Sequence, residues 1–159
     1  MRDAPSWLQA LEARACEFWQ CAGAIENLRR LSAGASAETW QFDFVSERER
    51  VPCILRKDAV TNTASMSLCI DKSLEFRVLA EARKADVAAA MPYFEFDAGY
   101  VMERVSGETL PRRILRDAGF AHARTVLTEQ CALALARIHA TPAVSGLVDY
   151  SARQQLDEL

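Results

Sequence analysis

The stretch TWQFDFVSERERVPCILR, residues 39–56, decides the fold of this chain, because it has the pattern of two strands joined by a charged turn. Over 39–45 apolar and polar residues alternate, which is typical of a half-buried strand. Its apolar face carries Trp40, Phe42 and Phe44. Residues 46–50 supply the turn and 51–56 the returning strand. The stretch therefore predicts an antiparallel hairpin.

Upstream of the hairpin the apolar period is helical. Large apolar side chains recur between Trp7 and Trp19, with Ser6 as the expected N-cap. The segment 1–24 is therefore expected to be an N-terminal helix. A further strand at about 28–33 and a turn of small residues over 32–37 lead into the hairpin.

Downstream of the hairpin, a segment of small polar residues over 58–69 precedes a helix that Asp71 can cap. This helix has an apolar stripe made of Leu74, Val78, Leu79 and Ala82. Strands at 93–96 and 100–105 follow, joined by a tight turn at 97–99. One helix is thus inserted after the third strand of a sheet of about five antiparallel strands, which spans residues 25–105.

The remainder, 106–159, is expected to be helical. A basic piece covers 110–117, and a longer helix covers Thr125 to His139 and ends before Pro142. The longer helix has an apolar face formed by Leu127, Cys131, Ala134, Leu135 and Ile138. Residues 151–159 begin another helical pattern. Strands followed by helices predict the α+β class.

Composition excludes several classes of protein. The 159 residues are half apolar and carry a net charge of −3, which argues against a nucleic-acid-binding protein. The start has no apolar signal segment, and no window approaches the length of a membrane-spanning helix. The five cysteines have neither metal-ligand spacing nor a disulfide pattern and are expected to be buried apolar residues. A cytoplasmic protein without a membrane partner is expected.

The small-residue turn is the first candidate site. A glycine such as Gly34 lets backbone N–H groups approach an anion, and the hydroxyls of Ser32 and Ser36 add donors. A phosphate could be held in this way. The alternative is an ordinary hairpin turn, because only one glycine is present.

Two charged side chains form the second candidate site. Arg56 ends the returning strand, and Glu75 borders the apolar stripe of the following helix. In kinases a strand cation and a helix carboxylate form the ion pair that orients a phosphate-binding side chain. The alternative is two solvated surface charges. Lys57 points to the opposite face of the sheet and is the weaker candidate.

The strand at 100–105 supplies the third candidate site. In a two-lobe kinase such a strand links the lobes, and its backbone carbonyl and N–H groups form hydrogen bonds with the edge of an adenine ring. Glu103 and Val105 are the expected backbone donors and acceptors, and Met102 is expected to guard the back of the pocket. The alternative is a plain edge strand.

Five stretches cover nearly the whole chain in a fixed order: LSAGASAETWQF (31–42), CILRKDA (53–59), LEFRVLAEA (74–82), YVMERVSGETLPRRILRD (100–117) and QCALALARIHA (130–140). With them the chain resembles the aminoglycoside phosphotransferase-like superfamily, in the branch related to kinase-like domains fused to some acyl-CoA dehydrogenases. The resemblance implies a kinase-like N-lobe followed by the first helices of a C-lobe. It implies that 31–42 covers ATP, that Arg56 replaces the kinase strand lysine with Glu75 as its partner, and that 102–105 is the hinge.

The sequence departs from this family at two places. Ala33 and Ala37 stand where the loop usually has a second Gly and an Asn, which implies a looser phosphate cradle. No His-x-Asp occurs anywhere, although the family needs a catalytic Asp, an Asn and an Asp for Mg²⁺. Their expected place lies beyond Leu159, so a truncated chain, inactive alone, is expected. The intact protein would transfer the γ-phosphate of ATP to a small-molecule hydroxyl.

Two other functions stay open. The first is a non-catalytic, kinase-derived module that binds nucleotide or a partner protein. The second is a stress or scaffold protein unrelated to kinases, which a separation of Arg56 and Glu75 beyond about 10 Å would favour. An incomplete C-lobe should also expose Leu127, Leu135 and Ile138, through which the chain can self-associate.

Overall fold

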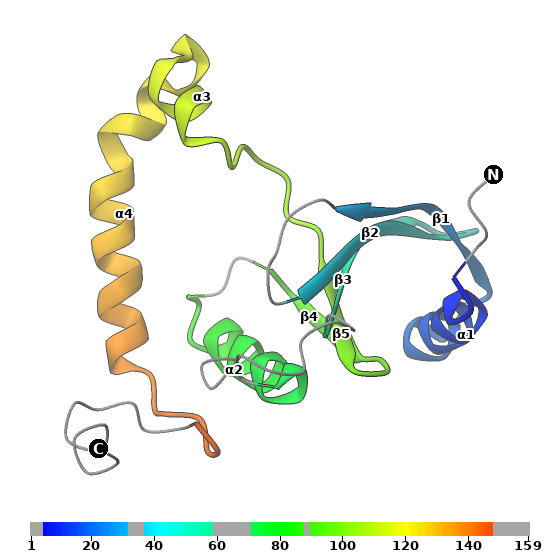
Figure 1. Cartoon of the computed structure of the whole chain (residues 1–159). Helices are drawn as coiled ribbons and strands as arrows, with labels where there is room; N and C mark the ends of the chain where they lie inside the picture. The colour runs from blue at the N-terminus through cyan, green and yellow to red at the C-terminus, as the bar shows by residue number, and fades with distance from the viewer. Residues whose placement is uncertain (1–4, 32–36, 59–70, 88–89, 148–159) are drawn as a thin grey trace, which may run out of the picture.

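The computed structural model describes residues 5–31, 37–58, 71–87 and 90–147 (Figure 1). Five helical segments and five strands lie in these ranges. In chain order they are α1 (Leu8–Trp19), β1 (Gly23–Leu31), β2 (Ala37–Ser46), β3 (Arg50–Asp58), α2 (Lys72–Lys84), β4 (Pro92–Glu95), β5 (Gly99–Glu103), α3 (Pro111–Arg116), the 3₁₀ turn η1 (Ala118–Phe120) and α4 (Ala121–Ala140).

The five strands form one antiparallel sheet in the order β1-β2-β3-β5-β4. The predicted hairpin is present, with Phe42 opposite Cys53 and Thr39 opposite Arg56. Helix α2 follows the third strand, and β4 and β5 return as a second hairpin on the far side of β3. The α+β class, the five-stranded antiparallel sheet and the inserted helix are thus confirmed.

One face of the sheet builds the hydrophobic core against α1. Phe42 and Phe44 are buried there together with Leu11 and Ala15 of the helix, and the Trp19 ring stacks on Phe44 at 4.6 Å. Trp40 is half-buried and packs on the same cluster, as its shared face with the two phenylalanines predicts. Figure 1 shows α1 and α2 on opposite sides of the sheet. The face toward α2 carries charged side chains beside the buried ones of Ile54 and Tyr100.

The start of the chain differs from its prediction in two respects. Trp7, without a side-chain capping bond, precedes α1, so Ser6 as the N-cap was wrong. The helix ends because Gln20 adopts a left-handed conformation with φ of 52°. Strand β1 then begins at Gly23, several residues earlier than expected. A Cβ at Gly23 would lie 2.5 Å from the Phe44 ring, so only glycine fits this entry to the sheet.

Helix α2 begins as predicted at a capping aspartate. The Asp71 carboxylate accepts a hydrogen bond from the Leu74 N–H at 2.7 Å. Leu74 is buried, and the Phe76 ring lies 5.8 Å from that of Tyr100 on β5. The cap and this contact fix the first two turns of α2 beside the sheet. The predicted polar segment before it lies, apart from Asp58, outside the described residues.

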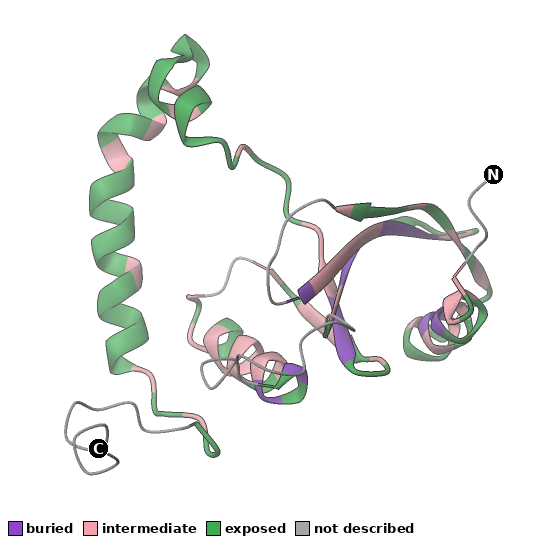
Figure 2. Cartoon of the chain, viewed as in Figure 1, coloured by how far each residue is buried: buried purple, intermediate pink, exposed green. Residues whose placement is uncertain are grey.

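After β5 the chain leaves the sheet and forms α3, η1 and α4, which stand apart from it in Figure 1. Helix α4 has no buried residue, and Figure 2 shows it almost wholly in the colour of exposed residues. Leu127, Leu135 and Ile138 are 38%, 52% and 50% exposed, as predicted for each of them. Cys131 is also exposed, which corrects its expected burial.

The predicted end of α4 is confirmed as well. The helix stops at Ala140 and leaves Thr141 in an extended conformation, as a residue before proline prefers. The helical pattern over 151–159 lies outside the described residues. Among the helices that the structure describes, none is long and apolar enough to cross a membrane.

Docking of α1 on the sheet should make a large contribution to stability. We expect Leu11→Ala to lower the free energy of unfolding by about 3 kcal/mol, because it leaves a cavity at a fully buried site. Leu115→Ala is the matched control: this leucine is 66% exposed, and its loss should change the same quantity by less than about 0.5 kcal/mol. Urea denaturation measures both, and equal effects would contradict the assigned core.

Candidate functional site

Arg56 and Glu75 lie together on the α2 side of the sheet. The Arg56 Nη2 atom is 3.0 Å from Glu75 Oε1, and the side chains are 32% and 24% exposed. The predicted ion pair is therefore confirmed, and the alternative of two separate solvated charges is wrong. The short distance also removes the condition that would have favoured a scaffold protein unrelated to kinases. Strand β3 supplies the cation and the first turn of α2 supplies the carboxylate.

The sheet face around this ion pair follows from the strand register. Arg56 stands between Thr39 on β2 and Tyr100 on β5, and Ile54 stands between Gln41 and Met102. Tyr100 and Ile54 are buried. Because neighbours in register share a face, this face has an apolar floor between the ion pair and the end of β5.

Lys57 points to the other face, as predicted from the alternation along β3. Its Nζ lies 2.7 Å from Asp97 Oδ2 and 5.1 Å from the centre of the Trp7 ring, on the α1 side. A cation over an aromatic face is stabilised by the ring quadrupole. Lys57 therefore has partners of its own and takes no part in the Arg56–Glu75 pair.

Lys72 is a second cation at this ion pair that was not predicted from the sequence. It is only 6% exposed, and its Nζ lies 3.0 Å from Glu75 Oε2 and 3.5 Å from Asp58 Oδ1. The spacing of three residues between Lys72 and Glu75 in one helix could have indicated this contact, whereas the second partner, Asp58, is distant along the chain. Glu75 therefore has one cation near each oxygen.

Two buried atoms of the pair have no hydrogen-bond partner within the described ranges of the chain. They are Arg56 Nε and Glu75 Oε2; for the latter, Lys72 is within ion-pair distance but not in hydrogen-bond geometry. A buried donor without an acceptor costs about 1–3 kcal/mol, so such atoms are rare and call for a partner. Arg56 thus keeps donor capacity that suits an anion.

The predicted phosphate-loop residues Ser32, Gly34 and Ser36 lie outside the described residues. The ends of their two flanking strands are described. Leu31 pairs with Thr39, and Thr39 pairs with Arg56. Leu31 and Ala37, the described residues on either side of these three, therefore lie at the same end of their strands as Arg56.

The predicted hinge residues follow the same face to the end of β5. Met102 pairs with Ile54 and Pro92 and is half-buried. The Glu103 N–H donates to the Met91 carbonyl at 2.8 Å, so only the carbonyl of Glu103 is left to act as a backbone partner of a ligand. The N–H of the next residue, Arg104, donates to the Pro52 carbonyl on β3.

Two other backbone groups of the predicted hinge make no hydrogen bond within the described residues. Because the N–H groups at 103 and 104 bond in opposite directions, the Glu103 carbonyl faces away from β3. The Met91 N–H, which could bond it, donates to the Glu103 carboxylate instead, at 3.1 Å. Val105 is 51% exposed, and its backbone makes no hydrogen bond within the described part of the chain. One acceptor and one donor thus remain near Met102.

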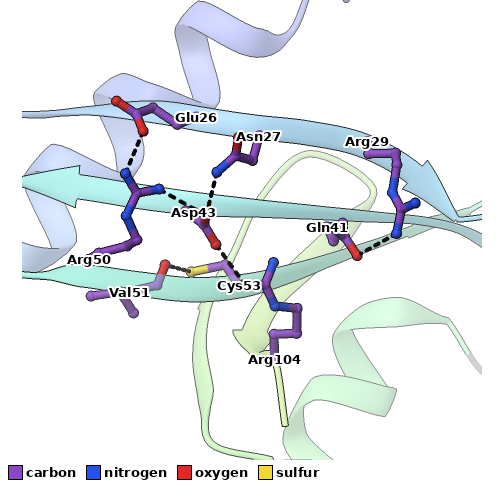
Figure 3. A network of polar contacts seen from close by, with 9 residues as sticks. All are labelled: Glu26, Asn27, Arg29, Gln41, Asp43, Arg50, Val51, Cys53 and Arg104. Atoms are coloured by element: carbon purple, nitrogen blue, oxygen red, sulfur yellow. Dashed lines mark hydrogen bonds and ion pairs between the residues drawn. The ribbon is translucent and has the colours of Figure 1, made fainter. Parts of the chain in front are cut away.

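A buried carboxylate on β2 ties the segment that follows β5 to the rest of the sheet, as Figure 3 shows. Asp43 is 6% exposed. Its Oδ1 accepts from Arg104 Nη2 at 2.8 Å, and its Oδ2 accepts from Asn27 Nδ2 at 2.7 Å and from Arg50 Nη1 at 3.0 Å. Arg50 also reaches Glu26 at 2.7 Å. The sequence did not predict this network, because its members come from four separate segments.

The network lowers the pKa of Asp43. The hydrogen bond from Asn27 is the largest cause; burial opposes it, and Arg50 and Arg104 add to the lowering. Asn27 can reach the carboxylate because it sits at an irregularity of β1 with φ of 55°. Asparagine tolerates this left-handed conformation better than most residues.

Within the described ranges, no group of three or more His, Cys, Asp or Glu side chains could hold a metal ion. No protein-family model and no curated protein matches the chain. The arrangement of Arg56, Glu75 and the hinge therefore rests on the geometry of this chain and on the resemblance described above.

The ionised form of Asp43 should stabilise the fold. We expect Asp43→Asn to lower the free energy of unfolding by about 2–3 kcal/mol near neutral pH, since Arg50 and Arg104 lose their shared carboxylate. Because the folded pKa lies below the ordinary 3.8, the difference is complete above that pH and is lost as pH falls through the folded value. Denaturation of both proteins between pH 2 and 7 tests this; a constant difference would contradict it.

Proposed function

We propose that this chain is the nucleotide-binding portion of a kinase-like phosphotransferase. The observation that carries the proposal is the 3.0 Å ion pair between Arg56 on β3 and Glu75 on α2, the helix inserted after the third strand. ATP would lie along the sheet face opposite α1, with its phosphates near Arg56 and its adenine near the end of β5.

The phosphate end of this site has suitable chemistry. In kinases the strand cation contacts the nucleotide phosphates only while a helix carboxylate holds it in place. A guanidinium presents several donors in a fixed plane that match phosphate oxygens. Arg56 uses Nη2 for Glu75 and keeps a buried Nε without an acceptor, so a phosphate oxygen would satisfy it.

The adenine end also fits. Ile54 and Met102 offer apolar contacts on the same sheet face. Beyond them lie the Glu103 carbonyl and the Val105 N–H, one acceptor and one donor. An adenine edge presents one donor and one acceptor in return. Ligand pockets commonly combine an apolar lining with a few convergent polar groups of this kind.

The same chemistry limits what this chain can do alone. Phosphoryl transfer depends on positioning and on Mg²⁺, and the sequence contains no His-x-Asp that could supply the catalytic aspartate. We therefore propose binding without transfer for this chain. In an intact protein, Mg²⁺ ligands and a catalytic loop from elsewhere would direct the γ-phosphate to a small-molecule hydroxyl.

Nucleotide titration tests the proposal with a closely matched pair of variants. We expect Arg56→Met to weaken ATP binding at least about tenfold, the effect of losing one charge-assisted hydrogen bond. Lys57→Met removes the neighbouring cation from the opposite face and should leave the ATP dissociation constant unchanged. Isothermal calorimetry of ATP and of adenosine, with and without Mg²⁺, provides the measurement.

Comparing ATP with adenosine distinguishes the phosphate end of the site from the adenine end. Adenosine lacks phosphates, so its affinity should be the same for the wild-type chain and for Arg56→Met. The assignment of Arg56 would be contradicted if wild type and Arg56→Met bound ATP with equal affinity. It would also be contradicted if Lys57→Met lost more ATP affinity than Arg56→Met. If the wild-type chain bound no nucleotide at all, the proposed function itself would be contradicted.

A second candidate function is partner binding through α4. Its apolar face, defined by Leu127, Cys131, Ala134, Leu135 and Ile138, is exposed or half-exposed throughout. Exposed apolar surface of this kind commonly marks an interaction site. It would suit a non-catalytic binding module, and it permits self-association of the isolated chain.

Self-association through this face can be measured directly. We expect the sedimentation coefficient of the wild-type chain to rise with protein concentration, and Leu135→Glu to reduce that rise by placing a charge in the apolar face. Leu133→Glu is the control, because Leu133 is similarly exposed but lies on the other side of the helix. A wild-type chain that stays monomeric at all concentrations would contradict the expectation.

A further inference from the structure

Lys72 occupies an unusual position for a lysine. Together with Asp43 it is one of two buried charged residues in the described ranges. Its Nζ lies between two carboxylates from different elements, 3.0 Å from Glu75 Oε2 on α2 and 3.5 Å from Asp58 Oδ1 at the end of β3. The ammonium therefore joins the end of β3 to the start of α2.

Within α2, only Glu75, three residues further on, favours a cation at this position. Lys72 is the first residue of α2, where the positive end of the helix dipole favours acidic side chains. Its burial also removes an ammonium from water, which is unfavourable unless carboxylates compensate for it. A residue that opposes both the helix dipole and the cost of burying a charge is more typical of a functional position than of a structural one.

The contacts of Glu75 show what Lys72 does there. Oε1 lies 3.0 Å from Arg56 Nη2, and Oε2 lies 3.0 Å from Lys72 Nζ. Each oxygen has its own cation, so the carboxylate is held from both sides. Without Lys72, both oxygens would be free to pair with the guanidinium in the bidentate geometry that arginine and carboxylate prefer. That pairing would consume donors of Arg56.

We propose that Lys72 is a positioning residue of the phosphate site, acting through Glu75. By engaging Oε2 it leaves Arg56 with one carboxylate contact and with donors, including Nε, for the phosphates of a nucleotide. The inference rests on the proposed function, because it takes the anion at Arg56 to be a nucleotide polyphosphate. The series Asp58, Lys72, Glu75 and Arg56 alternates in charge, and its last cation is the one that faces the ligand.

Calorimetric titration of the full chain with ATP and with adenosine tests the role of Lys72. We expect Lys72→Met to raise the ATP dissociation constant about tenfold and to leave that of adenosine unchanged. Lys72→Arg keeps the cation and should bind ATP within about threefold of wild type. A purely structural role would instead weaken ATP and adenosine alike, which would overturn the proposal.

Asp58→Asn provides an independent test that leaves the Lys72 side chain itself in place. Asp58 is 54% exposed and competes with Glu75 for Lys72. Its neutralisation should tighten ATP binding by about twofold, as expected for one exposed charge pair. Unchanged or weaker binding would overturn the proposed series of charges, and this result is accessible even if Lys72→Met does not fold.

The failures of the two proposals are distinguishable. A wild-type chain that binds no ATP contradicts the proposed function and with it the role of Lys72. If the wild-type chain binds ATP, Arg56→Met weakens that binding and Lys72→Met does not, then Arg56 keeps its role and only that of Lys72 is overturned.

Discussion

The ion pair between Arg56 and Glu75 is the contact on which the candidate site depends. It joins the third strand to the helix inserted after that strand, and it places a cation on the sheet face opposite α1. A partly buried ion pair adds little to stability once the loss of hydration is counted. Its contribution is geometric. The carboxylate fixes the position of the guanidinium, and the strand register determines which residues are its neighbours on that face.

The other strands of the sheet support the arrangement of residues on this face. The aromatic core cluster that includes Phe42 and Phe44 lies on the other side, where α1 covers β2, and the α2 side carries charged groups beside the buried side chains of Ile54 and Tyr100. At the far end of that side, Asp43 joins two arginines, and one of them, Arg104, lies between Glu103 and Val105, the residues predicted as a hinge. Arg56 and Glu103 therefore belong to one sheet, and the Arg104 side chain ties the segment that follows β5 to β2.

The sequence predicted those features whose cause is local. Alternation over 39–45 placed Phe42 and Phe44 in the core, Asp71 marked the start of α2, and Arg56 and Lys57 were assigned to opposite faces. The features it did not predict depend on distant segments. Lys72 and Asp43 look like surface charges until the fold surrounds them, and the Glu103 N–H is occupied by a carbonyl twelve residues away. Ser32, Gly34 and Ser36 remain predictions.

The unpartnered Nε of Arg56 allows the most direct test of the central claim. Its N–H resonance can be followed by ¹H–¹⁵N NMR while ATP or adenosine is added, with Arg56→Lys used to assign the signal. The structure predicts that ATP shifts this resonance, since a phosphate oxygen supplies the missing acceptor, and that adenosine does not. A resonance that stays in place while ATP saturates the protein would contradict a phosphate site at Arg56.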